Sequence, residues 1–252
     1  MRIQCFATTG CLLLVSFCLW LVEPGFPMNH SGTSQALGIE GRRVNSFRVE
    51  RVSVIDALLQ LGRQEQIPMG IEYIDLQALE EPISVTTGPS TVAEVLNAIL
   101  SKASGYSWSV RDGVVAISHA SIGRNHRNLL NWRLSHFSVT KMTLADASHL
   151  LEMTLAHELQ PDVKGWVGSY SPGNSRKTVG PLDLHDVSVR KALNRLVAQA
   201  GSAAWIVQVP PGGLGQLPSY GLWRIVEYET TAGPYAPFLL QILRSPKTRA
   251  TP

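Results

Sequence analysis

Cysteine is missing from most of this chain. The 252-residue sequence has three cysteines, Cys5, Cys11 and Cys18, and all of them lie near its N-terminus. The remainder therefore cannot contain disulfide bonds, a thiol nucleophile or thiolate metal ligands. Its stability must come from packing and hydrogen bonding.

An excess of charge of one sign is also missing. The formal net charge is +3, only 16% of the residues are charged, and 44% are hydrophobic. This composition is ordinary for a globular protein and does not by itself indicate a nucleic-acid partner. The basic residues near the start, Arg42, Arg43, Arg48 and Arg51, are scattered, so we interpret them as solvated surface charge.

The N-terminal segment carries a marked hydrophobic run. It extends for 12 residues from Cys11 to Val22, which matches the core of a secretory signal; counting back to Cys5 gives 18 residues, diluted by Thr8, Thr9 and Gly10. We therefore predict that residues 1–27 are a signal peptide or an uncleaved signal anchor, and that residues 28–43 form a flexible lead-in. The protein is then expected in the periplasm or outside the cell, with membrane contact only through this segment if it stays uncleaved. Export argues against a nucleic-acid partner.

One stretch of about 20 residues occurs twice. Shifting the sequence by 97 positions places Thr91–Val110 on Ser188–Val207, with identical residues at Val92/Val189, Leu96/Leu193, Asn97/Asn194, Ala103/Ala200, Trp108/Trp205 and Val110/Val207. Each copy has a capping residue, an apolar helix face and an extended segment. Self-similarity at a fixed distance indicates duplicated modules.

The repeat extends upstream with a different shift. Phe137 and Val139 match Phe47 and Val49, and Thr143, Asp146 and Ala147 match Ser53, Asp56 and Ala57, all at a distance of 90 positions. The seven-residue difference is explained by an insertion at Ser171–Lys177.

The two copies predict an α+β fold of two tandem βαββαββ modules, with helices packed on small mixed sheets. We place module 1 at residues 44–119, a joint at 120–133, module 2 at 134–229 and a mostly disordered tail at 230–252. Within module 1 we expect the helix after Ser53 to end at Gly62 and Pro68, and we expect residues 76–82 (LQALEEP) to form an acidic turn.

This order of elements behind an export leader resembles the STN domain, the short N-terminal module of secretins and of TonB-dependent signalling receptors. The resemblance rests on VIDALLQLGRQEQIPMGIEY, ISVTTGPSTVAEVLNAIL and GYSWSVRDGVVAIS in module 1. Module 2 matches more loosely because of its insertion and a long loop at Pro210–Ser219. In that family the module makes protein contacts in the periplasm and carries no catalytic residues. We find no counterpart of the outer-membrane barrel or secretin ring domain in these 252 residues, so we do not expect a channel or receptor function to be carried over.

Several histidines raise the question of a metal site. His149, Glu152, His157 and Glu158 lie in one predicted helix, Leu144–Leu159, but His157 is about 80° round the helix from His149. We interpret these residues as solvated helix surface, and the sequence predicts no metal-binding residues and no cofactor.

The sequence signals for catalytic motifs are as weak as those for a metal site. His185, Asp186 and Ser188 are too close in the chain to form a hydrolase triad, and Asp186 and Ser188 suit the cap of the next helix. The glycine-rich loop at 210–215 lacks the lysine and helix of a phosphate-binding loop. Trp108 and Trp205 occupy equivalent places and are interpreted as core residues rather than stacking platforms. The sequence therefore predicts no catalytic residues, and we expect the protein not to be an enzyme.

The function expected from these features is a non-catalytic, exported binding or assembly module in the cell envelope, whose partner is an envelope protein or a second copy of the chain. Exposed strand edges would offer a route to binding by strand addition. The alternative is a small envelope hydrolase or carbohydrate-binding protein that uses a cleft between the modules, lined by Trp166, Arg176 and His185.

Overall fold

The computed structural model describes residues 38–74, 76–122, 128–159, 161, 175–209 and 223–228. Several expected features lie outside these residues: the leader, the lead-in up to residue 37, a strand expected at Trp166–Tyr170, the loop at 210–219 and the tail at 230–252. The described chain is an α+β structure whose helices pack against small mixed and antiparallel sheets.

The first half of the chain has the predicted series of strand, helix, two strands, helix and two strands, together with short elements that the sequence does not predict. The elements are η1 (Ile39–Gly41), β1 (Arg43–Val44), β2 (Phe47–Val52), α1 (Val54–Glu65), β3 (Met69–Tyr73), α2 (Leu76–Glu80), β4 (Ile83–Thr87), β5 (Ser90–Thr91), α3 (Val92–Leu100), β6 (Tyr106–Arg111) and β7 (Val114–His119).

The second half has a matching series. Its elements are η3 (Leu129–Asn131), β8 (Arg133–Val139), β9 (Met142–Thr143), α4 (Leu144–Leu159), β10 (Thr178–Val179), β11 (Leu182–Ser188), α5 (Val189–Ala200), β12 (Ala203–Gln208) and β13 (Trp223–Glu227).

The helices begin where the capping residues predict. Ser53 Oγ accepts a 3.0 Å hydrogen bond from Asp56 N, and Ser188 Oγ accepts a 3.2 Å bond from Lys191 N. Thr91 and Glu94 complete a capping box at the start of α3. These bonds satisfy backbone N–H groups that have no partner within the helix.

Three local expectations need correction. The last part of the predicted lead-in is structured, because residues 39–44 form η1 and β1, and β1 pairs with β5. The predicted acidic turn contains the helix α2. Gly62 does not end α1, which continues to Glu65 and closes on Gln66 in the left-handed conformation, with φ of 51°.

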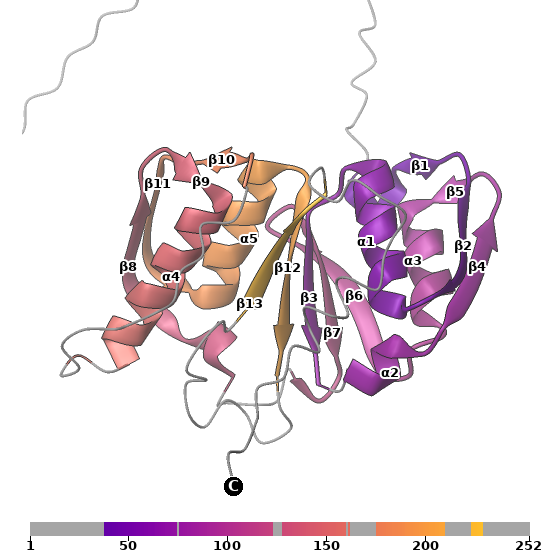
Figure 1. The fold of residues 1–252 in the computed structure, drawn as a ribbon, viewed down its shortest axis with the longest axis horizontal. Helices are drawn as coiled ribbons and strands as arrows, with labels where there is room; N and C mark the ends of the chain where they lie inside the picture. Colours follow the sequence, from indigo (N-terminus) through magenta and orange to yellow (C-terminus); the bar gives the residue numbers. More distant parts are fainter. Residues whose placement is uncertain are drawn as a thin grey trace, which may run out of the picture. The chain divides into compact units, whose positions relative to one another are not determined.

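A single five-stranded sheet joins the two halves. Its strand order is β13-β12-β3-β7-β6, and within it the halves meet in the parallel pairing of β12 with β3, in which Trp205 lies opposite Gly70. In Figure 1 this sheet stands at the centre, with α1 and α3 on one side and α4 and α5 on the other. The antiparallel pair β2–β4 lies outside the first helices, and β8–β11 lies outside the second.

Alternate residues of the central strands enter different hydrophobic cores. Ala204 and Ile206 of β12 belong to the core of α1 and α3, whereas Ala203, Trp205 and Val207 belong to the core of α4 and α5. Successive side chains of a strand point to opposite faces, so a sheet covered on both faces requires a nearly continuous apolar run. The segment AAWIV has this composition.

Candidate functional site

The outer side of β6 is an open end of the central sheet. Among the described residues, β6 pairs only with β7. Ala120 N donates a 2.9 Å hydrogen bond to Gly105 O, and bonded and non-bonded pairs alternate along an antiparallel ladder from that point. The alternation directs the N–H and C=O groups of Trp108 and Val110 outwards. These are the groups to which an added strand would bond.

A hollow of about 340 Å³ lies beside this edge, where the C-terminal end of α3 meets β6. Its lining consists of Asn97, Leu100, Ser101, Tyr106, Ser107 and Trp108. Trp108 Nε1 donates a 2.8 Å hydrogen bond to Asn97 Oδ1, which fixes the indole against the helix. The site therefore combines outward backbone groups with a partly exposed aromatic side chain that is held in place.

The second half contains the same arrangement, but there it is covered. Trp205 Nε1 donates a 2.9 Å hydrogen bond to Asn194 Oδ1, and the Trp205 side chain is fully buried. The covering strand is β3: a Cβ atom added to Gly70 would lie 2.3 Å from Trp205 Cζ2. Glycine is required at that position because any larger residue would collide with the indole.

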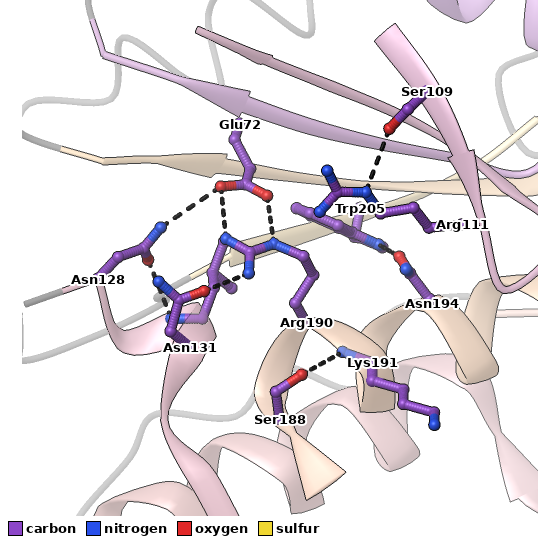
Figure 2. Close-up of polar contacts among 11 residues, drawn as sticks. Glu72, Ser109, Arg111, Asn128, Asn131, Ser188, Arg190, Lys191, Asn194 and Trp205 are labelled. Carbon is purple, nitrogen blue, oxygen red and sulfur yellow. Dashed lines mark hydrogen bonds and ion pairs between the residues drawn. The ribbon is translucent and has the colours of Figure 1, made fainter. Parts of the chain in front are cut away.

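A buried ion pair also links the halves (Figure 2). Glu72 of β3 accepts two hydrogen bonds from the Arg190 guanidinium of α5, at 2.6 Å and 2.9 Å. Only 4% of the Glu72 side chain and 16% of the Arg190 side chain are exposed. Asn128 Nδ2 also approaches Glu72, at 3.4 Å, and Arg190 bonds Asn131 Oδ1. Every charged atom of this junction thus has a polar partner.

Tyr228 reaches from the end of β13 into the core of the first half. Its side chain is buried, and Tyr228 Oη donates a 2.8 Å hydrogen bond to Ile67 O. Burial raises the pKa of this phenol far above the usual value of a tyrosine. Gly62 leaves the space for the ring, because a Cβ atom there would lie 2.3 Å from Tyr228 Oη.

The polar residues of α4 do not converge on one point. His149 Nδ1 and Glu152 Oε2 are 4.0 Å apart, whereas Glu158 Oε1 accepts hydrogen bonds from the backbone and hydroxyl of Ser135, at 2.8 Å and 2.6 Å. Burial alone would raise the pKa of Glu158, but the bonds from Ser135 and from Trp132 lower it below the usual value. His157 is exposed. Glu158 thus links α4 to β8 by hydrogen bonds.

The other residues singled out in the sequence are also separated. Ser188 caps α5, and Asp186 accepts a 2.6 Å hydrogen bond from Arg133 Nε. Arg176 N bonds Glu227 Oε2 at 3.0 Å, whereas His185 stacks on His136 of β8. Trp166, the third residue expected in a cleft, lies outside the described residues. The arginines Arg42, Arg43, Arg48 and Arg51 are all exposed.

Two groups of polar residues that contact each other in the structure are not predicted from the sequence. Glu72 and Arg190 are 118 positions apart, and His136 and Asp183 are 47 apart. The one available signal for the first group is a charged residue inside an apolar strand, MGIEY. In the second group, Asp183 and His185 are two positions apart, so the sequence places them on one face of a strand. That His136 lies beside them follows only from the pairing of β8 with β11.

Comparisons with models of protein families, with curated proteins and with solved structures find no match to this chain. The resemblance to the STN domain therefore stays a prediction. Among the described residues, no helix is long and apolar enough to cross a membrane.

Proposed function

We propose that the protein is a non-catalytic, exported binding or assembly module that makes protein–protein contacts in the cell envelope. The contact is strand addition: an extended segment of a partner protein pairs with the outer side of β6. Backbone hydrogen bonds would supply affinity, and the hollow beside Trp108 would select the side chains of the partner.

One observation carries this proposal, namely that the molecule already uses the equivalent edge internally. The shift of 97 positions relates β6 to β12, and the edge of β12 that corresponds to the open edge of β6 is paired in parallel with β3. Gly70 of β3 lies there against Trp205. By this analogy, the partner strand runs parallel to β6 and has a glycine or another small residue opposite Trp108.

A synthetic peptide that contains residues 67–74, IPMGIEYI, on a soluble lysine tail provides a direct probe. We expect it to bind the full chain, because β3 occupies the equivalent edge in the second half. Val110→Pro should abolish binding, because proline removes an outward N–H group while the ladder to β7 is preserved. The matched control Val110→Thr keeps the N–H and should bind as the wild type does. Fluorescence anisotropy measures the affinity, and hydrogen exchange should show protection at Trp108 and Val110.

The same variants distinguish the possible partners. Proteins captured from envelope extracts by the wild type and Val110→Thr, but not by Val110→Pro, would be partners at β6. If the wild type dimerises in sedimentation experiments and only Val110→Pro stays monomeric, the partner is a second copy of the chain. Peptide binding and capture that are both unchanged in Val110→Pro would refute the proposal.

A further inference from the structure

A cluster of two histidines and one aspartate lies on the exposed face of the β8–β11 sheet. His136 and His185 are directly opposite each other in the antiparallel pairing. Their rings stack, with centroids 4.5 Å apart and planes inclined by 13°. His136 Nε2 is 2.7 Å from Asp183 Oδ1, and His185 Nε2 is 3.4 Å from the same oxygen. Three possible ligand atoms therefore converge within 4.8 Å of one another.

The strand pair itself determines this convergence. Asp183 and His185 are two residues apart on one strand, so their side chains share a face. Phe137, Val139 and Leu184 point to the opposite face, where they pack in the core of α4 and α5. Asp186 has a φ of 45° and interrupts the alternation, so that Val187 returns to the core. Ligands on strands anchored in this way are positioned more precisely than ligands on loops.

We propose that His136, His185 and Asp183 form a binding site for a divalent transition metal ion, with Zn²⁺ as the first candidate. Imidazole nitrogen together with a carboxylate oxygen suits Zn²⁺, Ni²⁺ and Cu²⁺, whereas Ca²⁺ and Mg²⁺ prefer a shell made of oxygen atoms. Three protein ligands leave a further coordination position open to water or to a group from a partner.

Two separations between ligand atoms bear directly on this assignment. Ligand atoms at about 2.0–2.1 Å from a tetrahedral zinc ion are about 3.3 Å apart. The 3.4 Å separation between His185 Nε2 and Asp183 Oδ1 already matches this value, and the 2.7 Å separation at His136 must open by a few tenths of an ångström. The two imidazole rings, which are now nearly parallel, must also turn so that both nitrogen lone pairs point at one ion. The side chains are 49%, 70% and 69% exposed for His136, His185 and Asp183, so neither adjustment is hindered by packing.

A simpler account is that the cluster is only a surface hydrogen-bond network. Both accounts use the same contact between His136 and Asp183, so that contact does not separate them. The first half of the chain lacks the cluster. Under the same shifts, its corresponding positions are Ser46, Thr86 and Gly88, which form no such ligand set. The ligand set is thus specific to the second half.

Zinc titration of the full chain, purified without a histidine tag, tests the proposal by isothermal titration calorimetry. We expect one zinc ion to bind per chain, and His136→Ala and His185→Ala should each weaken binding at least tenfold, because loss of an outer-shell partner alone costs about 10- to 100-fold. Asp183→Asn should weaken it too. The matched control His157→Ala removes an exposed histidine of α4 and should leave zinc affinity unchanged.

Two further readouts keep the test decisive. All three ligand side chains are exposed, so the variants should retain the urea midpoint of the wild type, and a loss of binding then reports on the site. Co²⁺ should give the visible absorption of a low-coordinate site, and excess Ca²⁺ or Mg²⁺ should not displace it. Zinc affinity unchanged in both histidine variants, or no saturable binding of Zn²⁺, Ni²⁺ or Cu²⁺ by the wild type, would overturn the proposal.

Discussion

At the scale of single residues, the ion pair between Glu72 and Arg190 has the largest consequences. Both charges are removed from water, and each depends on the other for compensation. A buried pair of this kind contributes little compared with apolar residues, but the loss of one partner leaves an uncompensated charge in the interior.

Arg190→Met should therefore lower the free energy of unfolding by about 3–5 kcal/mol, because Glu72 stays buried without its counter-ion. Urea unfolding measures the change. The double variant with Glu72→Met should recover most of the loss, since two apolar side chains of similar size then meet.

The matched control is the exposed pair formed by Arg48 and Glu50, whose side chains are 71% and 63% exposed. Arg48→Ala should leave the urea midpoint unchanged, because water and salt screen such a pair. If Arg190→Met behaves like Arg48→Ala, the pair has no structural role at the junction.

At the scale of elements, each helix–strand unit repeats one bond. Asn97 and Asn194 accept hydrogen bonds from the indoles of Trp108 and Trp205, at 2.8 Å and 2.9 Å. The geometry is nearly the same, but Asn97 is exposed and Asn194 is buried. The same hydrogen bond is thus found in an exposed and in a buried environment.

Asn194→Leu should be the more destabilising of the two equivalent substitutions. It leaves the Trp205 N–H buried without an acceptor, which costs about 1–3 kcal/mol. In Asn97→Leu the Trp108 N–H can donate a hydrogen bond to water instead. The loss of free energy of unfolding should therefore be much smaller than in Asn194→Leu. Urea midpoints of the two variants provide the measurement; equal losses would contradict the difference in environment.

This comparison also shows how far sequence reasoning reaches. The identical Asn and Trp positions, the capping residues and the apolar spacing predict the helices α1, α3, α4 and α5 and most strands, because these signals act over a few residues. They do not predict that Trp205 is covered by Gly70 while Trp108 stays partly exposed, because that depends on contacts more than 100 positions apart. Gly62 illustrates the same limit. The glycine is needed to leave space for the Tyr228 ring and does not mark the end of a helix.

At the scale of the molecule, the two halves share a sheet instead of meeting across a smooth joint. The duplicated sequence indicates two modules, each with its own sheets. The structure places β3 of the first half and β12 of the second side by side in one sheet, with a separate core on each face. The open edge of β6 is then specific to the first half, because the equivalent edge of β12 is paired with β3, and the ligand set on β8–β11 is specific to the second.

Tyr228 provides the test of this connection, since it extends from the second half into the core of the first. At neutral pH, Tyr228→Phe should lower the free energy of unfolding by about 1 kcal/mol, because Ile67 O loses its donor.

The difference from the wild type should shrink as the pH rises above about 10, the ordinary pKa of tyrosine. Above that pH the unfolded wild type releases the Tyr228 proton, whereas the folded wild type holds it because its pKa is raised. The wild type therefore loses stability as the pH rises, whereas the variant has no proton to release at this position. Tyr73, whose pKa burial raises to about 12, is present in both proteins and affects both alike. Urea midpoints at about pH 8 and about pH 11 measure the difference. A gap that stays constant between the two would show that Tyr228 is not held as a buried, neutral phenol between the halves.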